Sequence, residues 1–272
     1  MSSIALTFGA PETVPAGNID RKASNLVIPF LITPSAAYLK ISKHSKSEYS
    51  FLFESAASEK VGRYSFVGAG PRKVLKTGEG HGESVDPLPA LEAELSKNRV
   101  AEVPGLQLPP LTGGAIGYVG YDCVRYFEPK TARPMVDILK VPESLFMLFD
   151  TVVAFDGFHE VIKVISYLEV SSDTSKLAEA YGRAQGTITE ILEVLNSFGV
   201  PLPHQPPIKL GQKYKSNIGQ TGYEDHVRNL KNHIIAGDII QAVPSQRIAR
   251  PTSFHLPGAF CLSSQSRLWD EL

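Results

Sequence analysis

Apolar residues recur along this chain with two different periods, and each period predicts a different kind of element. Residues 1–25 show neither period and carry scattered Gly and Pro, which predicts a flexible N-terminal arm. Short aromatic and aliphatic runs bounded by turn-forming residues predict strands at 49–53, 64–67, 73–77, 113–121, 144–155 and 159–168. The dipeptide Asp156-Gly157 separates the last two runs. It predicts a hairpin with a type I′ turn, because both central residues of that turn need positive φ.

Spacings of three and four between apolar residues predict the helices. Two short helices are expected at 36–41, after the Thr33-Pro34 pair, and at 87–98. The longest stripe consists of Leu177, Tyr181, Ala184, Ile188, Ile191, Leu192 and Leu195. Asp173 or Thr174 could cap this helix, and Gly199 suits its end. A further stripe from residue 221 ends at Gly237, and residues 238–248 are then expected to form a strand.

Short strands and well-separated helices together predict an α+β fold, with antiparallel β-sheets packed against flanking helices. The chain divides into the arm 1–25, an N-terminal domain 26–200, a Pro-rich linker 201–215, the start of a second domain 216–255 and a tail 256–272. Residues 216–255 provide one helix and one strand, too few elements to bury a core by themselves.

Composition narrows the class of protein. The 272 residues are 43% hydrophobic and 20% charged, which excludes wholesale disorder. A net charge of -1 argues against a nucleic-acid partner, since such proteins usually carry a basic excess. The two cysteines cannot form a disulfide framework, and the chain shows neither a secretory signal nor an apolar run long enough for a bilayer. We therefore expect a cytoplasmic protein without a membrane partner.

General chemical motifs are absent from the sequence. It contains no GxSxG, HExxH, Walker or CxxC pattern. His226 and His233 are seven residues apart on one predicted helix, which is too far to share a metal ion, so no metal site is predicted. Glycines at 113, 114, 117 and 120 lie in a predicted strand, where they usually mark a bulge or a close backbone approach.

Four collinear blocks carry a resemblance to a known family. They read FLFES at 51–55 followed by VGRYSFVG at 61–68, GGAIGYVGYD at 113–122, FDTVVAF at 149–155 and AGDIIQAVPSQR at 236–247. In this order and spacing they resemble the large subunit of anthranilate synthase, component I, of the fungal type. The resemblance covers about residues 26–255. It implies an enzyme that converts chorismate and ammonia to anthranilate and pyruvate in tryptophan biosynthesis, with a glutamine amidotransferase subunit (component II) as its partner.

The resemblance also assigns roles to individual residues. The family binds the inhibitor L-tryptophan at the serine of a Leu-Leu-Glu-Ser motif, which reads Leu52-Phe53-Glu54-Ser55 here. Phe53, Glu54 and Ser55 are therefore the candidate effector-binding residues, and Phe53 replaces a leucine of the motif. Gln241 is the candidate catalytic residue. Family members that use water carry lysine at this place, whereas an amide can only position ammonia by hydrogen bonding.

The resemblance implies that much of the family's chorismate-binding domain lies beyond residue 255. That segment contains the catalytic histidine and the glutamates that hold Mg²⁺, so the ligands of this cofactor are missing here. Residues 256–272 match no part of the family. We therefore expect a truncated chain that is inactive alone. Two alternatives stay open: a non-catalytic regulatory fragment that retains part of the tryptophan site and the amidotransferase contact, and a fragment of aminodeoxychorismate synthase component I.

Overall fold

The computed structural model describes residues 2–7, 28–29, 32–54, 62–97, 99–101, 108–133, 137–170, 175, 177–201, 207, 209–251 and 260–261. The chain separates into two compact units. The first comprises Met1–Pro201 together with Gly258–Leu272, and the second comprises Leu202–Pro257.

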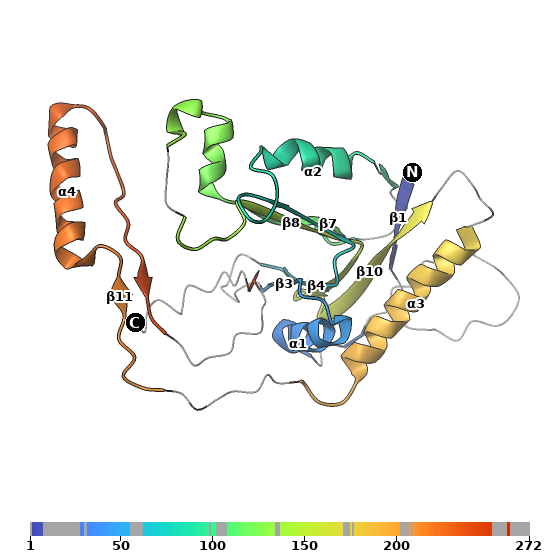
Figure 1. The fold of residues 1–272 in the computed structure, drawn as a ribbon. Helices are drawn as coiled ribbons and strands as arrows, with labels where there is room; N and C mark the ends of the chain where they lie inside the picture. Colours follow the sequence, from blue (N-terminus) through green and yellow to red (C-terminus); the bar gives the residue numbers. More distant parts are fainter. Residues whose placement is uncertain are drawn as a thin grey trace, which may run out of the picture. The chain divides into compact units, whose positions relative to one another are not determined.

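An eight-stranded sheet forms the central layer of the first unit (Figure 1). Its order is β13-β3-β4-β9-β10-β1-β6, and β2 also pairs with β10. Neighbouring strands are antiparallel, except that β1 is parallel to β6 and β13 is parallel to β3. The strands are β1 (Ser2–Thr7), β2 (Ile28–Pro29), β3 (Ser50–Phe53), β4 (Tyr64–Ala69), β6 (Arg99–Ala101), β9 (Thr151–Asp156), β10 (Val161–Val170) and β13 (Phe260–Cys261). Residues 2–7 thus form a strand within the segment expected to be an arm, whereas residues 8–25 lie outside the described part.

A smaller sheet of three antiparallel strands has the order β5-β8-β7. It comprises β5 (Lys73–Thr77), β7 (Gly114–Val119) and β8 (Ser144–Phe149). The prediction of one strand over 144–155 was therefore wrong, since the chain leaves the small sheet at Asp150 and enters the large sheet as β9. Both strands are buried almost throughout. Because buried apolar residues continue through both strands, the hydrophobic pattern of the sequence does not show where the chain crosses from one sheet to the other.

The predicted hairpin between β9 and β10 is confirmed, but its predicted turn is wrong. Asp156 pairs with Val161, so the loop has four residues, and its left-handed backbone lies at Glu160 (φ 54°). The fully buried Asp156 carboxylate accepts hydrogen bonds from Arg63 Nε at 2.8 Å and Nη2 at 2.6 Å. This guanidinium, together with His159, holds the pKa of Asp156 well below its usual range. The aspartate therefore organises the loop through its side chain rather than through a tight turn.

Alternating residues of the large sheet face two different layers. Leu52, Val67, Val153 and Phe155 pack in one buried cluster with residues of α1 (Pro34–Ser45) and α3 (Leu177–Asn196). Their neighbours Phe51, Phe66, Val152 and Ala154 pack in a second cluster with Ile116 and Met147 of the small sheet. Helices, large sheet and small sheet thus form three layers, which confirms the predicted α+β class.

The two outer helices are fixed at their ends. Thr33 Oγ1 accepts a hydrogen bond from the Ala36 amide at 3.2 Å and caps α1. The buried Lys40 ammonium of α1 donates to the Leu195 and Ser197 carbonyls, at 2.9 and 2.5 Å, where α3 ends. The predicted long helix is confirmed, although its candidate caps at 173 and 174 lie outside the described residues.

Short helices follow two strands of the small sheet. Helix α2 (Pro87–Leu95) confirms the expectation for residues 87–98, with the Asp86 side chain accepting from the Leu88 amide at 3.0 Å. After β7 the chain forms the 3₁₀ helices η1 (Tyr121–Tyr126) and η2 (Pro129–Thr131). Glu143 accepts hydrogen bonds from Arg125 and Tyr126 and so ties η1 to the start of β8.

The second unit contains α4 (Gly219–Ala236), which ends as predicted at Gly237 with φ 81°. Strand β11 (Lys215–Ser216) pairs with β12 (Ile248–Ala249). The prediction of a strand over 238–248 was wrong, because only its last residue belongs to a ladder. The ladder between β11 and β12 is only two residues long. Within the described part of the unit, the rest of the segment 238–248 therefore has no neighbouring strand to pair with.

Candidate functional site

The predicted effector motif lies at the end of β3, next to the first helix. The Phe53 ring packs against Phe51 with ring centroids 5.1 Å apart and is partly buried. Glu54 Oε2 accepts a hydrogen bond from Ser35 Oγ of α1 at 2.8 Å. Ser55 lies outside the described residues. The structure thus brings Phe53 and Glu54 to one strand end.

A cavity of about 140 Å³ opens beside Phe53, where β3 faces the small sheet. Its walls are mostly apolar and come from the segment 48–53 and from β7 and β8. The lining residues are Glu48, Tyr49, Ser50, Phe51, Phe53, Ile116, Gly117, Tyr118, Leu145 and Met147. Most of them were not predicted as site residues, because each reads as an ordinary core position in its own strand. The strand periodicity was the available signal, but it does not reveal which two sheets face each other.

Gly117 allows the close contact between β7 and β8 in the cavity wall. A Cβ added at this glycine would lie 1.8 Å from the Leu145 carbonyl oxygen and 2.9 Å from the Phe146 Cα. Both atoms belong to the backbone of β8. The expectation that this glycine marks a close backbone approach is therefore confirmed.

One charged side chain lines the cavity and another contacts its wall. The Glu48 side chain is exposed and lines it. The Lys76 ammonium of β5 lies 4.9 Å from the centroid of the Tyr49 ring, which forms another part of the wall. A hydrogen bond to Tyr49 is the main cause that raises the pKa of Lys76. The cavity therefore combines an aromatic interior with one carboxylate and one nearby ammonium group.

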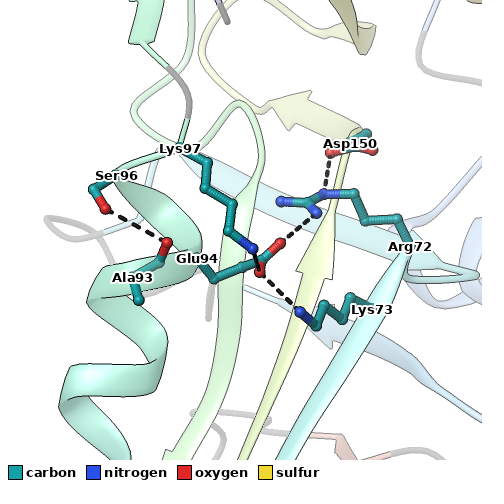
Figure 2. Close-up of polar contacts among 7 residues, drawn as sticks. All are labelled: Arg72, Lys73, Ala93, Glu94, Ser96, Lys97 and Asp150. Atoms are coloured by element: carbon teal, nitrogen blue, oxygen red, sulfur yellow. Dashed lines mark hydrogen bonds and ion pairs between the residues drawn. The ribbon is translucent and has the colours of Figure 1, made fainter.

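A second cluster of charges has a structural explanation (Figure 2). Glu94 of α2, only 7% exposed, accepts from Arg72 Nη1 at 2.9 Å, Lys73 Nζ at 2.8 Å and Lys97 Nζ at 2.6 Å. These bonds, first those from Lys73 and Lys97, hold the pKa of Glu94 well below its usual range. Arg72 Nε also donates to Asp150 at 2.9 Å. The cluster joins α2 to β5 and to the crossing between the two sheets.

The candidate catalytic residue Gln241 lies in the second unit, in the segment between α4 and β12. Its side chain is exposed. Because the predicted strand does not form there, Gln241 is not held by a β-ladder as the sequence suggested. The cavity belongs to the first unit and Gln241 to the second, and each is described by itself.

Neither a metal site nor a membrane span is found in the described part of the chain. No group of three or more His, Cys, Asp or Glu side chains there could hold a metal ion, so these residues do not fit the Mg²⁺ that the family resemblance implies. Among the same residues, no helix is both long and apolar enough to cross a bilayer.

Comparisons with known proteins agree on one family. A family model described as chorismate binding enzyme matches residues 48–266. Anthranilate synthase component 1 of Saccharomyces cerevisiae is 51% identical over 230 residues, which are 82% of this chain and 45% of that protein. The probable anthranilate synthase component 1 of Schizosaccharomyces pombe is 46% identical over 231 residues, 84% of this chain and 45% of that protein. The chain thus spans less than half the length of the curated relatives it matches.

A solved structure shows the same fold. Anthranilate synthase component I from Streptococcus pneumoniae superimposes with a TM-score of 0.52 over 85% of this chain and 49% of that chain. Its sequence identity is 23%, so this likeness supports the fold alone.

Proposed function

Because this chain belongs to the chorismate-binding enzyme family, we propose that it forms part of an anthranilate synthase component I. The reaction would convert chorismate and ammonia to anthranilate and pyruvate, in the cytosol. The observation that carries the proposal is the 51% identity to the Saccharomyces component 1 over 230 residues. Since the matched part is 45% of that relative, the reaction belongs to a protein that also contains the remaining length. The 272 residues alone are expected to be inactive.

The first unit would provide the regulatory site for L-tryptophan. Phe53 lines a cavity of about 140 Å³, and Glu54 and Ser55 follow it directly in sequence. An engineered apolar cavity of about 150 Å³ accepts benzene, so this space suits one aromatic ring. These observations support the tryptophan site that the resemblance implies at the end of the motif 52–55.

The second unit would contribute Gln241 to the nucleophile side of the reaction. A glutamine amide cannot deprotonate water at neutral pH, but it can accept and donate hydrogen bonds to ammonia. Ammonia would come from a glutamine amidotransferase subunit. When bound, Mg²⁺ would act on the substrate carboxylate. Its ligands would come from the segment of the family's chorismate-binding domain that these 272 residues do not include. The division at a linker over 201–215 stays a prediction.

A regulatory fragment is the second candidate function. The observation in its favour is that the described residues include the cavity but no group able to hold a metal ion. Aminodeoxychorismate synthase component I has less support, because the relatives described above are anthranilate synthases. The regulatory reading predicts that the 272-residue chain is itself a stable product that associates with the amidotransferase subunit.

A chimera tests the enzymatic proposal. The part of Saccharomyces component 1 that matches this chain is replaced by the matching residues of this chain, in a yeast strain that lacks component 1. We expect growth without tryptophan, and anthranilate formation from chorismate, ammonium and Mg²⁺ by the purified chimera. The 272-residue chain alone should restore neither. A folded chimera that makes no anthranilate would contradict the proposal.

The same chimera tests the site residues. Ser55→Ala should weaken inhibition by tryptophan while anthranilate formation without inhibitor is retained. The matched control Ser84→Ala changes an exposed serine of the loop before α2 and should leave inhibition unchanged. Gln241→Lys should lower anthranilate formation from ammonium. Equal inhibition of the Ser55→Ala chimera and its control would remove the proposed effector site.

A further inference from the structure

Gln241 lies in residues 238–247, the return segment, which is attached to the end of α4 at its first residue. Asp238 follows the helix cap Gly237 and contacts His233 twice. Its amide donates to the His233 carbonyl oxygen at 3.0 Å, and its Oδ2 lies 2.7 Å from His233 Nδ1. Because a carboxylate oxygen accepts hydrogen bonds, this second contact places a hydrogen on Nδ1. Asp238 is therefore fixed to the last turn of α4 by its backbone and by its side chain.

The end of the return segment is attached to the residues that precede α4. Asn217 Oδ1 accepts a hydrogen bond from the Arg247 amide at 2.8 Å, and the Asn217 amide donates to the Arg247 carbonyl oxygen at 3.0 Å. This pair extends the ladder between β11 and β12 by one position. Ser216 Oγ donates to Gln246 Oε1 at 2.9 Å and accepts from the Gly219 amide at 2.9 Å. The same hydroxyl thus joins the segment to the first residue of α4.

The two attachments leave the return segment little slack. Helix α4 has 18 residues, so it is about 27 Å long at 1.5 Å per residue. From residue 238 to residue 247 the backbone takes nine steps, which reach at most about 30–32 Å when fully extended. The chain turns at the end of α4 and returns to β11, so it covers the length of the helix nearly straight (Figure 1). While both ends are held, Gln241 has only a narrow range of positions.

We propose that Asn217 and Asp238 are positioning residues, which fix the place of Gln241 by holding the return segment extended between the two ends of α4. This inference rests on the proposed role of Gln241 in placing ammonia. Within the described part of the unit no β-ladder holds Gln241, so the attachments do what the expected strand would have done. Placement affects the rate strongly, because a displacement of about 1 Å can cost about a hundredfold.

Backbone dynamics of the 272-residue chain test the attachments directly. Asn217→Ala should lower the ¹⁵N order parameters of residues 239–245 to the range of flexible backbone, below about 0.6. Asn217→Asp keeps an acceptor oxygen for the Arg247 amide and should leave them unchanged. Asp238→Ala and Asp238→Asn form the same kind of pair at the other attachment. Asn229→Ala is the matched control, since Asn229 is an exposed asparagine of α4.

Kinetics of the chimera test the consequence for the reaction, with ammonium as the nitrogen source. Asn217→Ala should lower kcat by about tenfold or more and raise the KM for ammonium, with the KM for chorismate unchanged. Asn217→Asp should restore both values, and Asn229→Ala should alter neither. A substitution that only reduced the amount of folded enzyme would lower kcat and leave both KM values unchanged.

The outcomes separate this inference from the proposed function. If residues 239–245 are as ordered in Asn217→Ala as in the unaltered chain, the inference is wrong. It is also wrong if Asn217→Ala lowers kcat of the chimera without raising the KM for ammonium. An unaltered chimera that makes no anthranilate contradicts the proposed function instead, and the order parameters then decide on the attachments by themselves.

Discussion

Replacing Gly117 by alanine would add a methyl group where β7 and β8 approach each other most closely. The new Cβ would lie 1.8 Å from the Leu145 carbonyl oxygen and 2.9 Å from the Phe146 Cα. Because both are backbone atoms, no rotation of a side chain can relieve the overlap. The two strands must separate or shift. Either movement disturbs the ladder in which Ala115 and Ile116 pair with β8.

The size of the effect follows from overpacking. Inserting one extra group into a well-packed region costs about 1–3 kcal/mol of unfolding free energy. For a domain of 150–250 residues, each kcal/mol shifts Tm by roughly 2–4 °C. Gly117→Ala should therefore lower Tm by roughly 2–12 °C, measured by circular dichroism during heating.

The same substitution in α3 provides a matched control. Gly186 lies at an exposed position in the middle of this helix, and a Cβ added there meets no atom within 4 Å. Alanine is favoured over glycine inside a helix by about 0.5–1 kcal/mol, so Gly186→Ala should raise Tm by roughly 1–4 °C. The reasoning is refuted if both variants shift Tm in the same direction, since the argument depends on the space around each glycine.

Three further predictions concern charged side chains. Lys40→Met removes the ammonium that binds the last carbonyls of α3 and should lower the unfolding free energy by about 1.5–3 kcal/mol in urea titrations, whereas Lys43→Met should change little. Asp156 has a depressed pKa, so it stabilises the fold above its ordinary pKa of about 4 and loses this contribution as pH falls. The stability difference between the native chain and Asp156→Asn should thus be large near neutral pH and smaller at about pH 3. Glu94→Gln should lower Tm more than Asp150→Asn, because Glu94 is buried among three cations whereas the Asp150 side chain is 50% exposed.

Elements whose stability depends on local pattern were predictable from the sequence. Helix α3 buries Ala184, Ile188 and Leu195, all members of the predicted stripe. Helix α4 ends at Gly237, where the left-handed backbone favours glycine. In these cases the apolar spacing and the end signals agree with the final packing, so a single sequence contains enough information.

Elements whose place depends on a distant partner were not predictable in the same way. The run 144–155 has the composition of one strand, yet Asp150 marks a crossing between two sheets that only the complete fold defines. The Asp156-Gly157 pair has the chemistry of a tight turn, but its carboxylate is bound by Arg63, which lies more than ninety residues earlier in the chain. The ion pair between Arg63 and Asp156, and not the local turn preference of the Asp-Gly pair, thus determines the conformation of the loop.

The candidate site shows the same division between local and long-range information. Residues 53–55 were predicted from a motif that is contiguous in sequence, and Phe53 lines the cavity of the first unit. The cavity itself forms because β3 of one sheet faces β7 and β8 of another, with Gly117 allowing close contact in its wall. The register of β5 with β8 places Lys76 opposite Leu145, which lines the cavity. A contiguous motif is therefore visible in the sequence, whereas the residues that surround the cavity are determined by how the two sheets pack together.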